Sequence, residues 1–124
     1  MTKVGKAYGF IGCSKTIDEV RGMLPLIRQV SQTPSNLELT VTEGIENIVG
    51  DKVLHETVIR DLKTAGNFNY AFEASLTGHD NVDTANELGS IVNQLYQSPI
   101  FEPKPKDFYA TVVYERNGQY EQLE

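Results

Sequence analysis

Three residue types that cooperate in covalent catalysis occur near the ends of stretches that read as β-strands. Cys13 follows the first stretch, Glu43 closes the second, and His79 follows the third. A thiol can act as a nucleophile, an imidazole can take up its proton, and a carboxylate can orient the imidazole. If the three strands end at one edge of a sheet, the chain could be a small enzyme with Cys13, His79 and Glu43 as its catalytic residues.

The same strand ends carry side chains suited to holding a small ligand. Ser14, Lys15 and Thr16 follow the first stretch, while Thr77 and Asp80 flank the end of the third. Ligands of open α/β sheets lie beyond the carboxyl ends of parallel strands, where helix N-termini offer unpaired N–H groups to anions. We therefore expect these five residues to bind a small anionic ligand, and we favour this function over catalysis.

A metal ion is the alternative occupant of this edge. His79 and Asp80, with Glu43 or Glu46, combine imidazole and carboxylate groups that suit zinc, manganese or magnesium. The other histidine, His55, falls on a different predicted element, so the chain has no closely spaced histidine pair. The sequence identifies no particular metal or cofactor.

The run from Gly9 to Thr16 resembles the phosphate-binding pattern G-x-x-x-x-G-K-[ST]. It lies between a predicted strand and a predicted helix, which is the context that this pattern requires. Ser14, however, replaces the glycine that lets the backbone curl around phosphate, and Phe10 and Ile11 are typical of a strand. We therefore expect anion binding at the helix N-terminus in place of nucleotide hydrolysis.

Glycines and hydrophobic periodicity predict the elements that would position these residues. Gly12, Gly44 and Gly78 each follow a strand-like run, and their spacing is about the length of one strand–helix unit. Apolar residues at every second position predict strands, and apolar residues three or four apart predict helices. The predicted strands are 4–13, 37–43, 68–77, 108–116 and 120–123, and the predicted helices lie within 16–32, 51–66 and 80–96.

Local signals mark several ends and interruptions of these elements. Thr16 and Glu19 match a capping box at the start of the first helix. Pro25 falls inside the same helical pattern and should kink the helix or begin a second one. Asn117 and Gly118 predict a tight hairpin between the last two strands.

The order β-α-β-α-β-α-β-β predicts a single α/β or α+β domain over residues 1–124. We expect a two-layer sandwich with a mixed sheet, helices on one face and a C-terminal β-hairpin; a ferredoxin-like sandwich is the alternative architecture. The clean alternation in 37–43 and 68–77 argues against strands that are buried on both faces. The second face of the sheet would then carry Thr40, Thr42, Ala71, Ser75, Tyr109, Thr111 and Val113.

A sheet face with so few charges is often covered by another subunit. We therefore expect a homo-oligomer. The third functional alternative follows from the same face: a structural or regulatory interaction protein that acts through it.

Composition narrows the class of partner. The net charge of −6 repels a phosphate backbone and the basic residues do not cluster, so we expect no nucleic-acid partner. No apolar run approaches the length of a membrane span, and the N-terminus lacks the apolar core of a signal peptide, so we expect a cytoplasmic protein with no membrane partner. The single cysteine, Cys13, cannot form an internal disulfide, which agrees with a reducing compartment.

Overall fold

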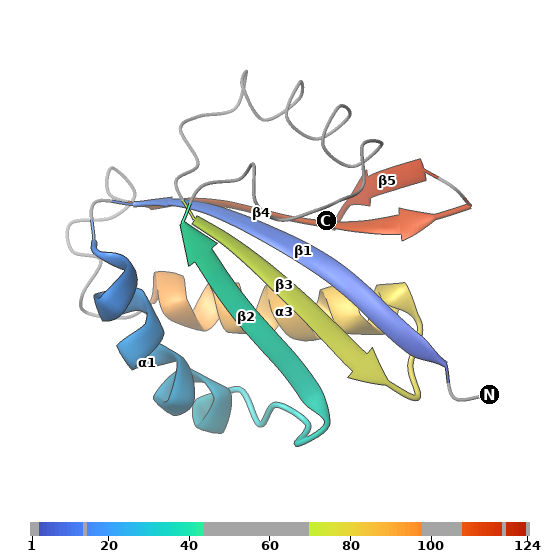
Figure 1. Cartoon of the computed structure of the whole chain (residues 1–124), viewed down its shortest axis with the longest axis horizontal. Coiled ribbons are helices and arrows are strands. Elements are labelled where there is room, and N and C mark those ends of the chain that lie inside the picture. The colour runs from blue at the N-terminus through green and yellow to red at the C-terminus, as the bar shows by residue number, and fades with distance from the viewer. Residues whose placement is uncertain (1–2, 14, 44–69, 98–107, 118, 124) are drawn as a thin grey trace.

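The computed structural model describes residues 3–13, 15–43, 70–97, 108–117 and 119–123 (Figure 1). Within these ranges the chain forms five strands and two helices. They are β1 (Val4–Cys13), α1 (Ile17–Val30), β2 (Leu37–Glu43), β3 (Tyr70–Thr77), α3 (Asn81–Tyr96), β4 (Phe108–Arg116) and β5 (Gln119–Gln122). The helix predicted within 51–66 falls outside the described residues.

All five strands form one sheet in the order β2-β3-β1-β4-β5, and every neighbouring pair is antiparallel. The predicted mixed sheet is therefore corrected, because β1 and β2 run in the same direction but β3 lies between them. The clean alternation of β2 and β3 is the pattern of antiparallel strands with helices on one face only. The described elements, before β5, follow the β-α-β-β-α-β order of a ferredoxin-like sandwich.

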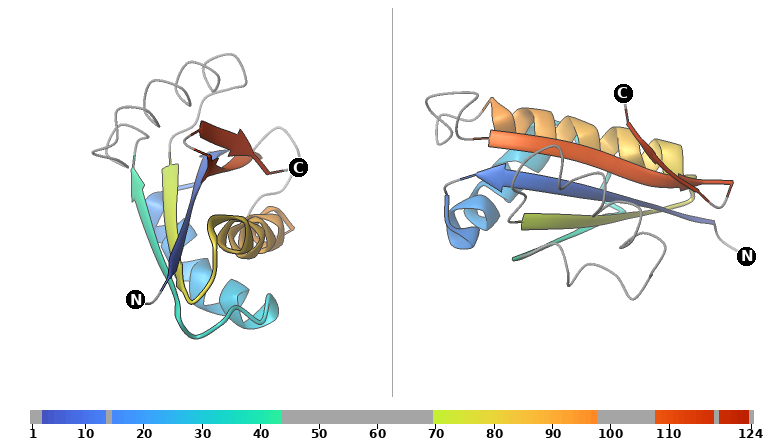
Figure 2. Two further views of the ribbon diagram at one scale, coloured as in Figure 1. Left: turned by 90° about the vertical axis from the view of Figure 1, so that its right-hand side faces the viewer. Right: turned by 90° about the horizontal axis from the view of Figure 1, so that it is seen from above.

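Both described helices lie against one face of the sheet, as predicted (Figure 2). Every second strand residue points toward them, and the helices return an apolar stripe with spacings of three and four residues. The buried core formed in this way includes Ala7, Ile11, Val20, Ile27, Leu37, Val41, Phe72, Ala74, Leu76, Ala85, Leu88, Ile91, Val92, Leu95 and Val112.

Two glycines of β1 allow α3 to lie close to the sheet. A Cβ atom added at Gly9 would be 3.3 Å from Cδ2 of Leu88. A Cβ atom added at Gly5 would collide with the carbonyl oxygen of Asp80 and the hydroxyl oxygen of Thr84. Thr84 is fully buried, and its hydroxyl donates to the Asp80 carbonyl at 2.9 Å. The start of α3 can therefore reach β1 only because position 5 has no side chain.

The second face of the sheet carries the residues that alternation placed there. Ala71 is opposite Phe10 on β1 and Thr42 on β2, and Val113 is opposite Tyr8. Phe10, Ala71 and Val113 are 3%, 1% and 5% exposed, so these apolar side chains are already buried in the single chain. Self-association through this face stays a prediction.

Local signals at the element ends agree with the structure, and of the two outcomes predicted at Pro25 a second helix is excluded while a kink stays a prediction. The Thr16 hydroxyl accepts the Glu19 N–H at 3.2 Å and the Glu19 carboxylate accepts the Thr16 N–H at 3.1 Å, which confirms the capping box. Pro25 lies inside α1, which continues to Val30, so no second helix begins there. Asn117 has a φ of 54° between β4 and β5, as the predicted hairpin turn requires.

Candidate functional site

The strand register separates the predicted site residues into two groups. Cys13 and Glu43 lie at the end of the sheet where β1 and β2 finish, and Glu43 is opposite Tyr70. Thr77 is opposite Val4 at the start of β1, so the turn that follows β3 lies at the other end of the sheet. The three strand ends therefore do not converge.

The predicted catalytic set of Cys13, His79 and Glu43 is wrong for a single chain. Cys13 ends β1, whereas His79 follows the strand whose last residue pairs with the first residue of β1. At about 3.3 Å per residue, the length of β1 places the two about 30 Å apart. A nucleophile and its base must lie within hydrogen-bond reach. The error arises because β3 is antiparallel and carries its following turn to the opposite end.

The end that holds Cys13 and Glu43 is organised around Tyr70. The Tyr70 hydroxyl donates to the carbonyl oxygen of Lys15 at 2.5 Å, which ties β3 to the segment before α1. Burial raises the pKa of Tyr70, and negative charge on Cys13, Glu43 and Glu19 raises it further. The surroundings of Tyr70 therefore favour its protonated form, which donates to the Lys15 carbonyl.

The segment that resembles a phosphate-binding loop does not have that conformation. Residues 9–13 remain in β1, where Gly12 and Cys13 are paired with β4. The Thr16 hydroxyl is engaged by both the backbone and the carboxylate of Glu19. Ser14 lies outside the described residues. The described part of this segment therefore extends a strand and begins a helix.

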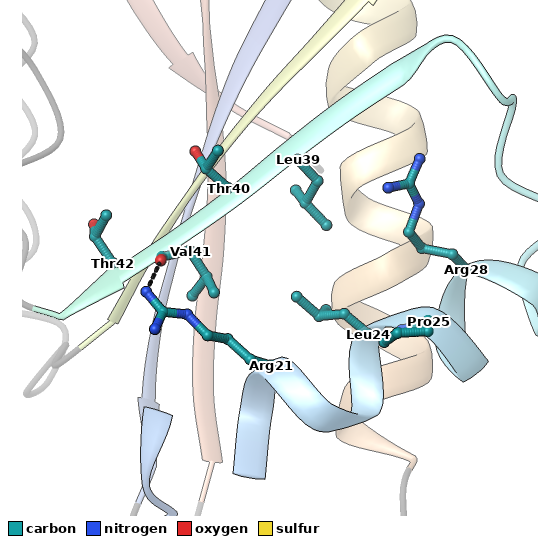
Figure 3. Close-up of a pocket in the computed structure, with 8 residues that line it drawn as sticks. All are labelled: Arg21, Leu24, Pro25, Arg28, Leu39, Thr40, Val41 and Thr42. Carbon is teal, nitrogen blue, oxygen red and sulfur yellow. Dashed lines mark hydrogen bonds between the residues drawn. The ribbon is translucent and has the colours of Figure 1, made fainter. Parts of the chain in front are cut away.

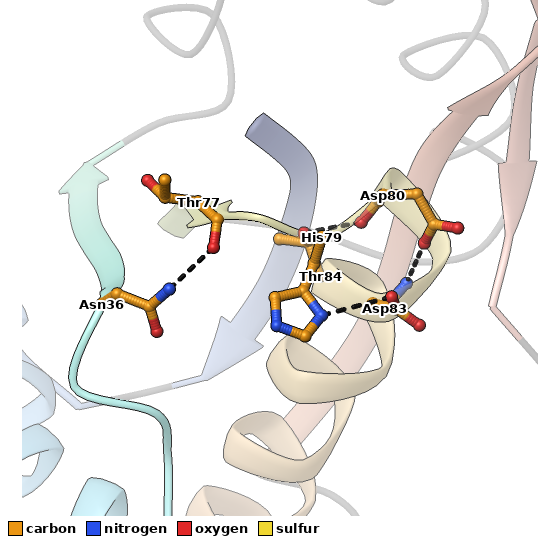
Figure 4. Close-up of polar contacts among 6 residues, drawn as sticks. All are labelled: Asn36, Thr77, His79, Asp80, Asp83 and Thr84. Atoms are coloured by element: carbon orange, nitrogen blue, oxygen red, sulfur yellow. Dashed lines mark hydrogen bonds and ion pairs between the residues drawn. The ribbon is translucent and has the colours of Figure 1, made fainter. Parts of the chain in front are cut away.

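The polar residues at the other end of the sheet bond to the fold itself (Figure 4). Asp80 caps α3, since its carboxylate accepts the Asp83 N–H at 2.9 Å. Nδ1 of His79 lies 3.3 Å from Oδ2 of Asp83. The Thr77 carbonyl accepts a hydrogen bond from the Asn36 side chain at 2.7 Å. These contacts hold the turn after β3 in place, which is a structural role.

We predict that Asp80→Asn reduces the acid sensitivity of the fold. The hydrogen bond from the Asp83 backbone lowers the pKa of Asp80, with smaller favourable effects from Lys3 and His79. A carboxyl group with a lowered folded-state pKa stabilises the protein above its unfolded-state pKa, and this contribution is lost as the pH falls through the folded-state value. Asparagine also caps helices but does not titrate.

The measurement for Asp80 is the free energy of unfolding by urea between neutral and acidic pH. The wild type should lose more stability than Asp80→Asn as the solution becomes acidic. Asp80→Ala is the control, because it removes the cap and should be the least stable variant at neutral pH. Parallel pH profiles for the wild type and Asp80→Asn would contradict the assignment of this pKa shift to the cap.

A groove of about 640 Å³ lies between α1 and β2, the strand at one edge of the sheet (Figure 3). This volume falls in the usual range of small-molecule sites. The helix provides one wall of the groove and the edge strand provides the other. The lining residues are Arg21, Leu24, Pro25 and Arg28 from α1 and Leu39, Thr40, Val41 and Thr42 from β2.

Two arginines reach across this groove to the backbone of β2. Nη2 of Arg21 donates to the Val41 carbonyl at 2.9 Å, and Nη2 of Arg28 donates to the Leu37 carbonyl at 2.6 Å. A guanidinium has several N–H donors, so one such bond leaves others for a ligand. Neither arginine pairs with a carboxylate from the described ranges. The groove therefore carries two positive charges that are uncompensated within those ranges.

Apolar side chains occupy the groove between the two arginines. Leu24 from α1 and Leu39 from β2 face each other there, and both pack partly against the hydrophobic core. Pro25 adds a backbone position without an N–H donor. An apolar floor between two fixed cations suits a ligand that has an apolar body and an anionic group.

Arg21 and Arg28 are not among the site residues predicted from the sequence. Their spacing of seven residues places them on one side of a helix, with Leu24 between them. This spacing is the feature of the sequence from which the two arginines could have been found. It becomes informative only when the edge strand beside α1 is known, because arginines on a helix are usually solvated.

The described residues contain no group of three or more His, Cys, Asp or Glu side chains that could hold a metal ion. Glu46, which was predicted as a possible metal ligand, lies outside these ranges, and so does His55. Within the same ranges, no helix is long and apolar enough to cross a membrane.

Comparison with known proteins adds little about function. No family model and no curated protein matches the chain. Among solved structures, it is similar to a phage SAM lyase in complex with S-methyl-5'-thioadenosine, with a TM-score of 0.46 and 10% sequence identity. The match covers 96% of this chain and 88% of the other.

Proposed function

We propose that the chain binds a small anionic ligand in the groove between α1 and β2. The observation that carries the proposal is the pair of arginines, Arg21 and Arg28, fixed to the β2 backbone on either side of an apolar floor. The class of ligand is the one that the sequence analysis favoured. The residues are different, because they come from the helix body and not from the strand ends.

The arginines are well placed to bind an anion without reorganising. Each guanidinium is already oriented by its bond to a β2 carbonyl, so less side-chain entropy is lost when a ligand binds. Arg28 is half-buried and Arg21 is exposed, so a charged group at Arg28 is shielded more from water. Hydrogen bonds between a guanidinium and a carboxylate or phosphate are stronger than neutral ones and are often bidentate.

We expect octanoate to stabilise the protein and to depend on the arginines. Octanoate has one carboxylate, so removing the arginine that binds it should weaken binding about ten-fold or more, and removing the other should have a smaller effect. Isothermal titration calorimetry with octanoate is the measurement, performed on the wild type, Arg21→Gln and Arg28→Gln. Thermal shifts would be compared with each variant's own ligand-free melting temperature, since a ligand that binds the folded state raises that temperature.

Arg116→Gln is the matched control for this experiment. Arg116 is an exposed arginine of β4, near the opposite edge of the sheet, where it pairs with Glu121 at 3.9 Å. Its loss changes the net charge equally but should leave octanoate binding unchanged. Octanol is the control ligand, because it keeps the chain and lacks the charge. Equal binding of octanol, or equal losses in all three arginine variants, would refute the proposal.

A further inference from the structure

The two arginines of the groove are separated along its length. Seven residues of α-helix correspond to a rise of about 10 Å between Arg21 and Arg28. The carbonyls that they contact belong to Val41 and Leu37, four residues apart on β2, which is about 13 Å of strand. The helix and the strand thus give similar separations. One compact anion cannot contact both guanidiniums while they remain bonded to the strand.

The space between the two arginines is lined by apolar side chains. Leu24 and Leu39 face it from the two walls, and Pro25 contributes no donor. Among the described residues that line the groove none is acidic, although the whole chain has a net charge of −6. The positive ends and the apolar middle of the groove are therefore complementary to a molecule that has a negative charge at each end and an apolar middle.

We infer that the ligand of this groove is a linear dianion, with a carboxylate at each end and an apolar spacer of about 10 Å between them. The inference rests on the proposed function and specifies its ligand class. One carboxylate binds Arg21, the other binds Arg28, and the spacer lies on Leu24 and Leu39. An α,ω-dicarboxylate of medium chain length is the simplest such molecule.

The state of the β2 edge favours a small molecule over an extended peptide. A peptide that joins a sheet as a further strand bonds to the outward N–H and C=O groups of the edge strand. Two outward carbonyls of β2, those of Leu37 and Val41, already accept bonds from the arginines. An added strand would have to displace both guanidiniums, whereas a dianion uses them where they are.

The test is calorimetry on the full chain with the series succinate, adipate, suberate, sebacate and dodecanedioate. Octanoate and decanoate serve as single-charge partners of suberate and sebacate. We expect affinity to pass through a maximum at medium length, with the best dicarboxylate binding at least ten-fold more tightly than the monocarboxylate of equal length. Arg21→Gln and Arg28→Gln should each remove this advantage, and Arg116→Gln should not.

The outcomes separate this inference from the proposed function. Arginine-dependent binding of monocarboxylates and dicarboxylates with equal affinity and no length dependence would overturn the inference and leave the proposed function standing. If no carboxylate bound in a way that depended on the arginines, both the inference and the proposed function would be overturned. Tighter binding of an extended peptide with two glutamates four residues apart than of any dicarboxylate would also overturn the inference.

Discussion

Gly5→Ala is expected to destabilise the protein by about 3 kcal/mol, the upper part of the range for overpacked sites. The new Cβ atom would collide with the Asp80 carbonyl and the Thr84 hydroxyl. Neither can move easily, because Thr84 is fully buried and its hydroxyl is bonded to that carbonyl. The start of α3 would have to move away from β1, which disturbs the packing of the helix on the sheet.

Chemical unfolding of Gly5→Ala and the wild type measures this loss. Gly22→Ala is the matched control, since Gly22 lies in α1 and a Cβ atom there meets nothing within 4 Å. That control should gain about 1 kcal/mol, because alanine is the better helix former. A Gly5→Ala protein as stable as the wild type would show that α3 does not pack against β1 in the way described.

Phe72→Ala should cost about 3–5 kcal/mol, the usual range for removing a buried aromatic side chain. Phe72 is fully buried on β3, which lies between β2 and β1, and it is opposite Val41 and Gly9 on these strands. Gly9 has no side chain, and the space above it is filled by Leu88 of α3, which lies beside the Cβ atom of Phe72. Truncation would leave a cavity that alanine and glycine cannot close.

The free energy of unfolding in urea or guanidinium chloride tests this value. Leu26→Ala is the control, because Leu26 is 55% exposed on α1 and its loss should change stability by about 0.5 kcal/mol or less. A change of similar size in both variants would contradict the central position of Phe72. A total stability of 5–15 kcal/mol is typical of such domains, so the predicted loss is a large share of it.

Much of the fold could be predicted from the hydrophobic periodicity of the sequence, but the direction of the strands could not. Alternation assigned the inner and outer faces of β2 and β3, and the register confirms both. Reversing a strand leaves its alternation unchanged, so the pattern cannot distinguish parallel from antiparallel neighbours. That choice depends on contacts between distant segments, such as Gly5 with Thr84 and Gly9 with Phe72.

The candidate site was less predictable than the fold for the same reason. The predicted residues were chosen for being at strand ends, and the direction of β3 sends Asp80 and Cys13 to opposite ends. Thr16 was recognised correctly as a helix cap, whereas Asp80, which was predicted to bind a ligand, also caps a helix. Arg21 and Arg28 can be recognised as candidate ligand-binding residues only when β2 is known to lie next to α1. That position is a property of the folded chain.

The hydrogen bonds from Arg21 and Arg28 to β2 also affect the tendency of the protein to aggregate at high concentration. Open sheet edges template the addition of other chains and lead to aggregation. At one edge of this sheet, the arginines occupy two backbone acceptors that a neighbouring chain would need. At the other, β5 is only four residues long and carries Glu121. Two helix side chains thus serve as gatekeepers against fibril-like growth.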